Sequence, residues 1–356
     1  MYQTILLTCI DRIDDEKSFS SIFHLLKGKR SAQTIQDAKT YGLSPFFGIL
    51  KSLTKNQFLK SLQKLHQDEY IEWKGEEAVS LTSRGKSYLR GRKNQEPEVA
   101  WFDGFHLHHI APHFRLRLLL WIQTASNLLK NHSHFIPVND HREVANWIKT
   151  FYQKKKKHLD THFTSLYEEL HQLLKLHQPF HADIFVATLT GFRKIGLSKQ
   201  QIAEKWNFTI EDAELYLQSS IHFILNKVHQ NQTEFPNLSE FIPHEIMQLP
   251  LTASAGKTLQ WLKQGYTIEQ ISRRRNLKVN TIQDHIVEII HVDPSYPVDS
   301  FVSPEEEQII RNKISELNTK RLKLIKEQLP ESISYFMIRI VMAKLYQSRE
   351  YAYAQK

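Results

Sequence analysis

One pattern of apolar, small and turn residues occurs twice in this sequence, and it restricts the fold more than any other feature. The later copy has Ile271 as an apolar anchor, Ser272 as a small neighbour and Asn276 at a turn. Further apolar residues follow at fixed offsets: Leu277, Val279, Ile282 and Ile286. A helix-turn-helix needs these residue types, because its two helices cross closely and its turn residue adopts a left-handed conformation. We therefore predict a helix-turn-helix here, with Thr267 capping its first helix.

The earlier copy has Ile202 as the anchor, Ala203 as the small residue and Asn207 at the turn. The apolar residues recur at the same offsets: Phe208, Ile210, Ala213 and Leu217. Because anchor, small and turn positions all repeat, the match argues against chance spacing. We predict a second helix-turn-helix-like element at 197–220.

The two copies differ in charge. The later one carries cations around its turn: Arg273, Arg274, Arg275 and Lys278. The earlier one opens its second helix with acidic residues, which repel phosphate: Glu211, Asp212 and Glu214. We therefore expect the later copy to contact DNA and the earlier copy to serve as a scaffold or protein contact.

The second helix of the later copy is expected to begin with Asn280 or Thr281 as its cap. Its exposed face is expected to offer Gln283, Asp284 and Glu288. Arginine residues that read guanine are missing from this face. The prediction is therefore binding to the DNA backbone or to a DNA structure, without sequence-specific recognition.

Aliphatic residues elsewhere recur mostly at helical spacing, and the chain has only 11 glycines and 12 prolines in 356 residues. This predicts a mainly α, multi-domain protein, because such a length accommodates two or three cores. Residues 1–93 form the first predicted domain, with helices over Ile5–Ile13, Phe19–Leu26, Ser31–Tyr41 and Pro45–Leu53, and one starting after Thr54. A hairpin follows, and the motif Leu81-Thr82-x-x-Gly85 then opens a last helix, an order that resembles a winged-helix domain. This unit could contact either DNA or protein.

A polar linker at 91–98 precedes a helical middle domain at 99–235, which includes the element at 197–220. Its Lys154–Lys157 run is either a solvated helix face or a phosphate contact. The third predicted domain covers 250–350 and contains the later helix-turn-helix.

The residues Thr258, Leu262, Gly265 and Thr267–Ile271, followed by Thr281–Ile286, resemble the helix-turn-helix domain appended to some RecQ-type DNA helicases. Phe301–Arg339 resembles the closing helices of that domain. Because the rest of the chain has no helicase core, the protein is similar to the YpbB-like family of Firmicutes. The resemblance implies a RecQ-like helicase as partner and a role in DNA transactions, and it supplies no reaction.

The sequence shows no catalytic motif. Gly256-Lys257-Thr258 lacks the upstream glycine of a phosphate loop, and Cys9 is the only cysteine. The cluster His106, His108, His109 and His113 is interrupted by Pro112, so a metal-binding face is not expected. We predict a non-enzymatic protein without cofactor or metal.

The net charge of +9 and the pI of about 9.3 fit a polyanionic partner. The predicted DNA-binding residues are Arg273, Arg274, Arg275, Lys278, Asn280, Thr281, Gln283, Lys320, Arg321 and Lys323. The predicted function is a DNA-associated accessory protein of a RecQ-like helicase in DNA repair or replication. The alternatives are a helix-turn-helix transcription regulator and a protein-interaction scaffold without DNA binding. The early Asp11 and the lack of a long apolar run predict a cytoplasmic protein without membrane contact. The predicted DNA binding adds the expectation that it is nucleoid-associated.

Overall fold

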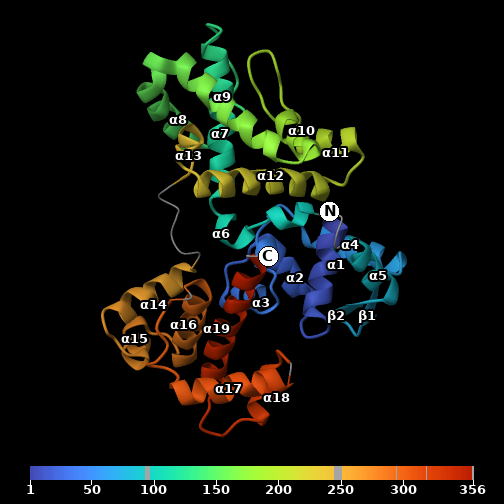
Figure 1. The fold of residues 1–356 in the computed structure, drawn as a ribbon, viewed down its shortest axis with the longest axis vertical. Helices are drawn as coiled ribbons and strands as arrows, with labels where there is room; N and C mark the ends of the chain where they lie inside the picture. Colours follow the sequence, from blue (N-terminus) through green and yellow to red (C-terminus); the bar gives the residue numbers. More distant parts are fainter. Residues whose placement is uncertain (93–96, 244–250, 294, 318, 355–356) are drawn as a thin grey trace. The chain divides into compact units, whose positions relative to one another are not determined.

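The computed structural model describes residues 1–92, 97–243, 251–293, 295–317 and 319–354 (Figure 1). The described residues form helices and one two-stranded sheet, which confirms the predicted mainly α fold. None of the described helices is long and apolar enough to cross a membrane. The chain packs into two compact units, and each unit combines segments that are distant in the sequence.

The first unit consists of Met1–Ile5, Ile49–Leu53 and Leu89–Met247. Its core surrounds the fully buried Trp121, which contacts Phe151 with ring centroids 4.7 Å apart. Its helices are η2 (Pro97–Trp101), α6 (Gly104–Leu107), α7 (Ala111–Leu128), α8 (Arg142–Lys155), η3 (Lys156–His158), α9 (Leu159–Leu176), α10 (Pro179–Ala187), α11 (Lys199–Trp206), α12 (Ile210–Gln230) and α13 (Pro236–Ser239).

The second unit consists of Leu6–Gly48, Thr54–Tyr88 and Gln248–Lys356. Helices α1 (Tyr2–Ile13) and α5 (Ser83–Arg92) each have one end in this unit. The other elements are α2 (Phe19–Lys27), α3 (Ala32–Thr40), η1 (Ser44–Phe46), α4 (Lys55–Gln67), β1 (Ile71–Lys74), β2 (Ala78–Leu81), α14 (Ala253–Lys263), α15 (Ile268–Arg275), α16 (Val279–Val292), α17 (Pro304–Leu317), α18 (Leu322–Glu327) and α19 (Tyr335–Ala354).

The hairpin β1–β2 follows α4 as predicted, with Ile71 opposite Leu81 in an antiparallel register. Thr54 and Gln57 form a reciprocal capping box at the start of α4. The backbone N–H of Phe19 donates to the carbonyl of Glu77 at 2.9 Å, which ties the hairpin to the start of α2. The helix α4 is therefore stabilised by a local cap, and the hairpin that follows it is held by a long-range hydrogen bond.

The motif Leu81-Thr82-x-x-Gly85 has a physical explanation. The Thr82 hydroxyl accepts a hydrogen bond from the N–H of Gly85 at 3.1 Å and donates to the carbonyl of Glu69 at 2.6 Å. A Cβ atom at position 85 would lie 2.2 Å from the carbonyl oxygen of Tyr70. Only glycine therefore allows α5 to pack this closely on the residue preceding β1.

Helix α3 joins the N-terminal and C-terminal segments of the second unit, because it packs against both α16 and α19 (Figure 1). Six of its nine residues are buried, including Ile35 and the charged Asp37 and Lys39. Arg339 of α19 donates to the Gln36 side chain at 3.3 Å, and Arg30 donates to the carbonyl of Leu251. Segments from opposite ends of the sequence thus share one packed unit.

The predicted helix over Pro45–Leu53 is wrong. Only η1 forms, and Gly48 adopts a left-handed φ of 70°. The N–H of Gly48 donates to the carbonyl of Leu25 at 2.9 Å, so a long-range hydrogen bond replaces the helical one. Residues 93–96 of the predicted linker lie outside the described residues, and the three-domain division at 1–93, 99–235 and 250–350 stays a prediction.

The packing of α3 predicts that a cavity in this helix weakens the distant helix α16. Replacing Ile35, which is 1% exposed, with Ala removes buried apolar contacts and should cost about 2–4 kcal/mol. Hydrogen exchange of the α16 amides should become faster in Ile35→Ala. The matched control is Ile202→Ala in the first unit, also fully buried, which should leave α16 exchange unchanged. Unchanged α16 exchange in Ile35→Ala would show that α3 does not support the C-terminal segment.

Candidate nucleic-acid interface

Each copy of the repeated pattern forms two helices joined by a turn, and the two turns have the same conformation. Thr267 and Gln270 form a capping box at α15, and Ser198 and Gln201 form one at α11. The turn residues are left-handed in both, with φ of 51° at Asn276 and 56° at Asn207. Asparagine suits this position because its short polar side chain tolerates a left-handed backbone.

Two of the three acidic residues of the earlier copy, Asp212 and Glu214, are engaged within the first unit. The Asp212 carboxylate accepts from the N–H of Tyr2 at 2.7 Å and lies 3.3 Å from the amino group of Met1. Glu214 forms an ion pair with Lys199 at 2.9 Å and accepts from the Ser52 hydroxyl. These contacts give the acidic helix start a role in packing.

The three arginines of the later copy have different environments. Arg273 is exposed at the end of α15. Arg274 is also exposed, and its guanidinium lies 4.5 Å from the Tyr266 ring centroid, a cation–π distance. Arg275 instead donates to the backbone and side-chain oxygens of Ser254, both at 2.9 Å, and to the Thr258 hydroxyl. The Arg275 guanidinium therefore holds α15 against α14, whereas Arg273 faces solvent.

Helix α16 begins at Val279, and its N-cap residue is Lys278 without a side-chain capping hydrogen bond. The predicted cap at Asn280 or Thr281 is wrong, because the helix starts earlier and both residues lie inside its first turn. Lys278 and Asn280 are exposed, and Thr281 and Gln283 are half-buried. These side chains, with Arg273 and Arg274, form the turn surface of the later helix-turn-helix.

The sequence predicts Glu288 on the exposed face of the second helix, and the structure shows that this prediction is wrong. Its side chain is 1% exposed and accepts hydrogen bonds from the backbone N–H and the hydroxyl of Thr252 at the start of α14. Burial raises the pKa of the Glu288 carboxyl. The C-terminal half of α16 is enclosed in the same way, with buried residues Ile286, Val287, Glu288, Ile289, Ile290 and His291. Only the N-terminal half of α16 is accessible to a ligand.

A pocket of about 470 Å³ lies between the N-terminal half of α16 and the start of α19. It is lined by Asn280, Gln283, Asp284, Ser334, Tyr335, Phe336 and Arg339. Arg339 forms an ion pair with Asp284 at 2.6 Å. The sequence assigns Tyr335 and Arg339 to the closing helices, and no local signal connects them with α16.

The predicted residues Lys320, Arg321 and Lys323 come from the segment around α18. Lys320 lies 4.4 Å from the Tyr41 ring centroid, and Arg321 pairs with Asp15 at 2.9 Å. Lys320 and Arg321 line a separate pocket of about 200 Å³, which shares no residue with the pocket between α16 and α19. Lys323 is exposed. The structure therefore places the ten predicted residues in two groups.

Within the histidine cluster, His108 contributes to packing, whereas His106 is exposed. His108 is buried and its Nδ1 lies 3.0 Å from the carbonyl oxygen of Gly104. Burial lowers the pKa of His108 to about 3. Among the described residues, no group of three or more His, Cys, Asp or Glu side chains is arranged to hold a metal ion.

Comparisons with known proteins match both ends of the chain. A family model described as a helix-turn-helix domain matches residues 254–342, and one described as an RQC domain matches residues 3–100. These are DNA-binding domain types without a catalytic role, and they occur together in the C-terminal region of RecQ. The protein is therefore a mainly α protein with an N-terminal, winged-helix-like RQC domain and a C-terminal helix-turn-helix domain.

A relative, "Protein YpbB" of Bacillus subtilis (strain 168), is 30% identical over 348 residues. The alignment covers 96% of this chain and 97% of that protein. The chain belongs to the YpbB family, which confirms the resemblance seen in the sequence. No solved structure gives a significant match.

The burial of α16 predicts a pH dependence of stability. His291 is 2% exposed, and burial, with Lys39 and Arg339 nearby, lowers its pKa to about 3. An unfolded histidine titrates near 6.5, so between these values the unfolded state binds more protons and acid destabilises the fold. The free energy of unfolding should therefore fall as the pH drops below about 6.5, by up to about 1.4 kcal/mol per pH unit for this group.

Urea unfolding at a series of pH values tests this. His291→Asn should show a shallower loss of stability between pH 6.5 and 4 than the parent protein. His134→Asn, which changes an exposed histidine, is the control and should keep the parent slope. Identical slopes in all three proteins would contradict a neutral, buried His291.

Proposed function

We propose that this protein is a non-enzymatic accessory factor that binds DNA and acts with a RecQ-like helicase in DNA repair or replication. The observation that carries the proposal is the pairing of an RQC domain and a helix-turn-helix domain, whose segments pack together in the second unit. Such a protein would be found in the cytoplasm, at the nucleoid.

The DNA contact that fits best is with the phosphate backbone. Arg273, Arg274 and Lys278 are exposed around the turn, and cations there would release counterions from DNA. Helix α16 itself contains no arginine or lysine, so its accessible N-terminal half lacks the side chains that most often read guanine in a major groove. Phosphate contacts of this kind position a protein on DNA without reading its sequence, which argues against a promoter-specific regulator.

Two loops of the first unit are candidates for the helicase contact: the first connects α7 with α8, the second connects α10 with α11, and both are anchored on α7. Gln123 holds the first loop through the carbonyl of Ile136 and the N–H of Val138, at 2.9 and 2.8 Å. Ser126, one turn later, accepts from the N–H of Phe192 in the second loop at 3.1 Å. The loops present Ile136 and Ile195, which are 90% and 88% exposed.

Contiguous exposed apolar patches mark protein contacts, and we propose that these two isoleucines, on loops held by neighbouring turns of α7, belong to one such patch. The second loop also exposes Arg193 and Lys194 beside Ile195. The complementary surface is an apolar depression with an acidic rim, and we propose that the helicase supplies it.

Reversing charge on the turn tests DNA binding. The double variant Arg273→Glu/Lys278→Glu should lower the affinity for a labelled duplex at least tenfold at low salt, measured by fluorescence anisotropy. The slope of log affinity against log salt should become shallower by about 2, because about 0.9 counterion is released per phosphate contact.

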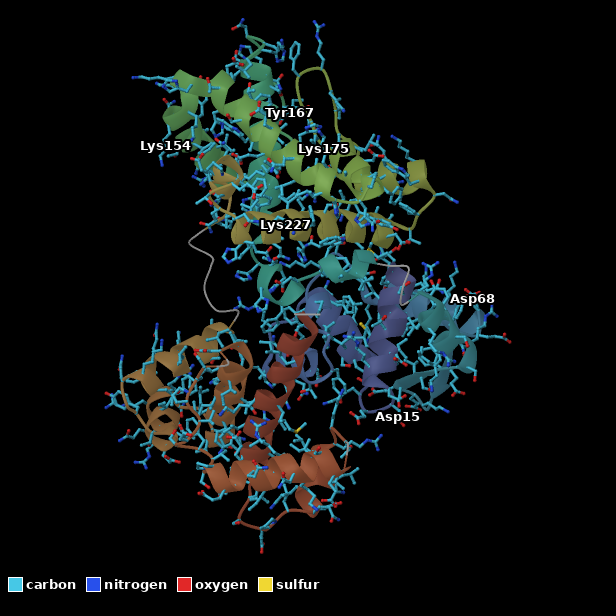
Figure 2. All side chains as sticks on the ribbon, in the orientation of Figure 1. Asp15, Asp68, Lys154, Tyr167, Lys175 and Lys227 are labelled. Atoms are coloured by element: carbon cyan, nitrogen blue, oxygen red, sulfur yellow. The ribbon has the colours of Figure 1, made fainter. Side chains whose placement is uncertain are left out.

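The matched control is Lys154→Glu/Lys157→Glu, which makes the same charge change on the exposed lysine run of the first unit (Figure 2). It should keep most of the affinity. An equal loss of DNA affinity in both double variants would show that the phosphate contact is not specific to the turn of the helix-turn-helix. If the parent protein showed no salt-dependent DNA binding, a protein-interaction scaffold would be the remaining candidate function.

Charge substitution in the loops tests the helicase contact. Ile136→Asp/Ile195→Asp should abolish co-purification with the RecQ-like helicase of the same organism, because the apolar contact is lost. DNA affinity should stay unchanged, since these loops belong to the other unit. The control is Val186→Asp on α10, which changes a less exposed apolar residue of the same unit. Retention of the helicase by the loop variant would disprove the loop contact.

A further inference from the structure

The pocket between α16 and α19 has a neutral, hydrogen-bonding lining. Its two charged side chains, Asp284 and Arg339, neutralise each other at 2.6 Å, and Arg339 also donates to Gln36 at 3.3 Å. A phosphate entering the pocket would meet the Asp284 carboxylate and find the arginine already engaged. The pocket therefore suits an uncharged ligand group.

Tyr335 supplies an exposed aromatic ring at the pocket. Its side chain is 48% exposed, although it is a large apolar ring at the first position of α19. The neighbouring Phe336 is only 8% exposed and belongs to the core of the C-terminal segment. Tyr335 is thus the ring that a planar ligand could stack on.

The polar groups of the pocket match the edges of a nucleobase. Asn280 and Gln283 each carry an amide, which offers a donor and an acceptor side by side and can pair with a base edge. The volume of about 470 Å³ lies within the range of roughly 300–1,000 Å³ of small-ligand sites. A base whose partner strand is absent presents both a face for stacking and an edge for these amides.

The pocket lies next to the cationic turn. Asn280 lines the pocket, and the exposed Lys278 precedes it by two residues at the N-cap of α16. A strand whose phosphate binds at the turn would therefore bring its bases close to the pocket. Cations that follow the backbone and an aromatic ring that stacks a base are the two parts of single-strand binding sites.

We propose that the pocket between α16 and α19 binds one unpaired DNA base, stacked on Tyr335, while the adjacent turn binds the backbone. The inference rests on the proposed DNA binding and adds a substrate class to it. The preferred substrate is DNA in which a duplex adjoins unpaired bases.

Anisotropy with two labelled DNAs tests the inference. One is a fully paired duplex, and the other is the same duplex with a short single-stranded extension. The parent protein should bind the extended DNA at least fivefold more tightly. Tyr335→Ala should lose this preference, and Tyr335→Phe should keep it, because base stacking needs the ring and not the hydroxyl.

A single 2-aminopurine in the extension reports on stacking directly. Its fluorescence should be quenched by the parent protein and by Tyr335→Phe, and not by Tyr335→Ala. The matched control is Tyr167→Ala, which removes another exposed tyrosine, 61% exposed on α9 of the first unit (Figure 2). It should behave as the parent protein.

The outcomes separate the two proposals. If the parent protein binds neither DNA, the proposed function fails. If it binds both DNAs equally, or if Tyr335→Ala keeps the preference, only the base pocket is overturned. If Tyr335→Ala loses affinity for both DNAs by the same factor, the pocket does not select unpaired bases and the inference is again wrong. Unchanged circular dichroism of Tyr335→Ala confirms that the variant is folded.

Discussion

The second unit depends on the burial of α3 between α16 and α19. The sequence of α3 is polar, and an isolated helix of nine residues is marginal in water, so its stability comes from tertiary packing. This packing buries even the charged Asp37: burial raises the pKa of its carboxyl, which pairs with Lys17 at 3.3 Å and accepts from Gln33 at 2.8 Å. The same packing encloses the C-terminal half of α16 and so decides which part of the helix-turn-helix faces solvent.

The features predicted correctly from the sequence are those fixed by neighbours in the chain. The helix caps at Thr54 and Thr267, the left-handed turn at Asn276 and the β1–β2 hairpin each involve residues a few positions apart. Their physical causes, a short polar side chain or an alternating apolar pattern, are visible in a window of about ten residues.

The features that sequence reasoning missed depend on distant residues. Glu288 accepts a hydrogen bond from Thr252, 36 residues earlier in the chain. The pocket on α16 is completed by Tyr335 and Arg339 of α19. Arg275 was grouped with Arg273, although the two guanidiniums face α14 and solvent respectively. A helical pattern shows which side chains share a face, but it does not show which other helix covers that face. The predicted DNA-binding set therefore stays a prediction, and the structure adds which of its side chains are exposed at the turn and which, like Arg275, are engaged in packing.

The arrangement of the second unit has a consequence for synthesis. Helix α3 leaves the ribosome early, whereas α19 begins at Tyr335, so the two are separated by nearly the whole length of the chain. At roughly 5–20 residues per second, α3 waits on the order of 15–60 seconds for this partner. During that time its buried face is uncovered, and contacts of such large sequence separation form slowly. Until α19 has been synthesised, the nascent N-terminal segment therefore exposes apolar surface that is buried in the finished unit.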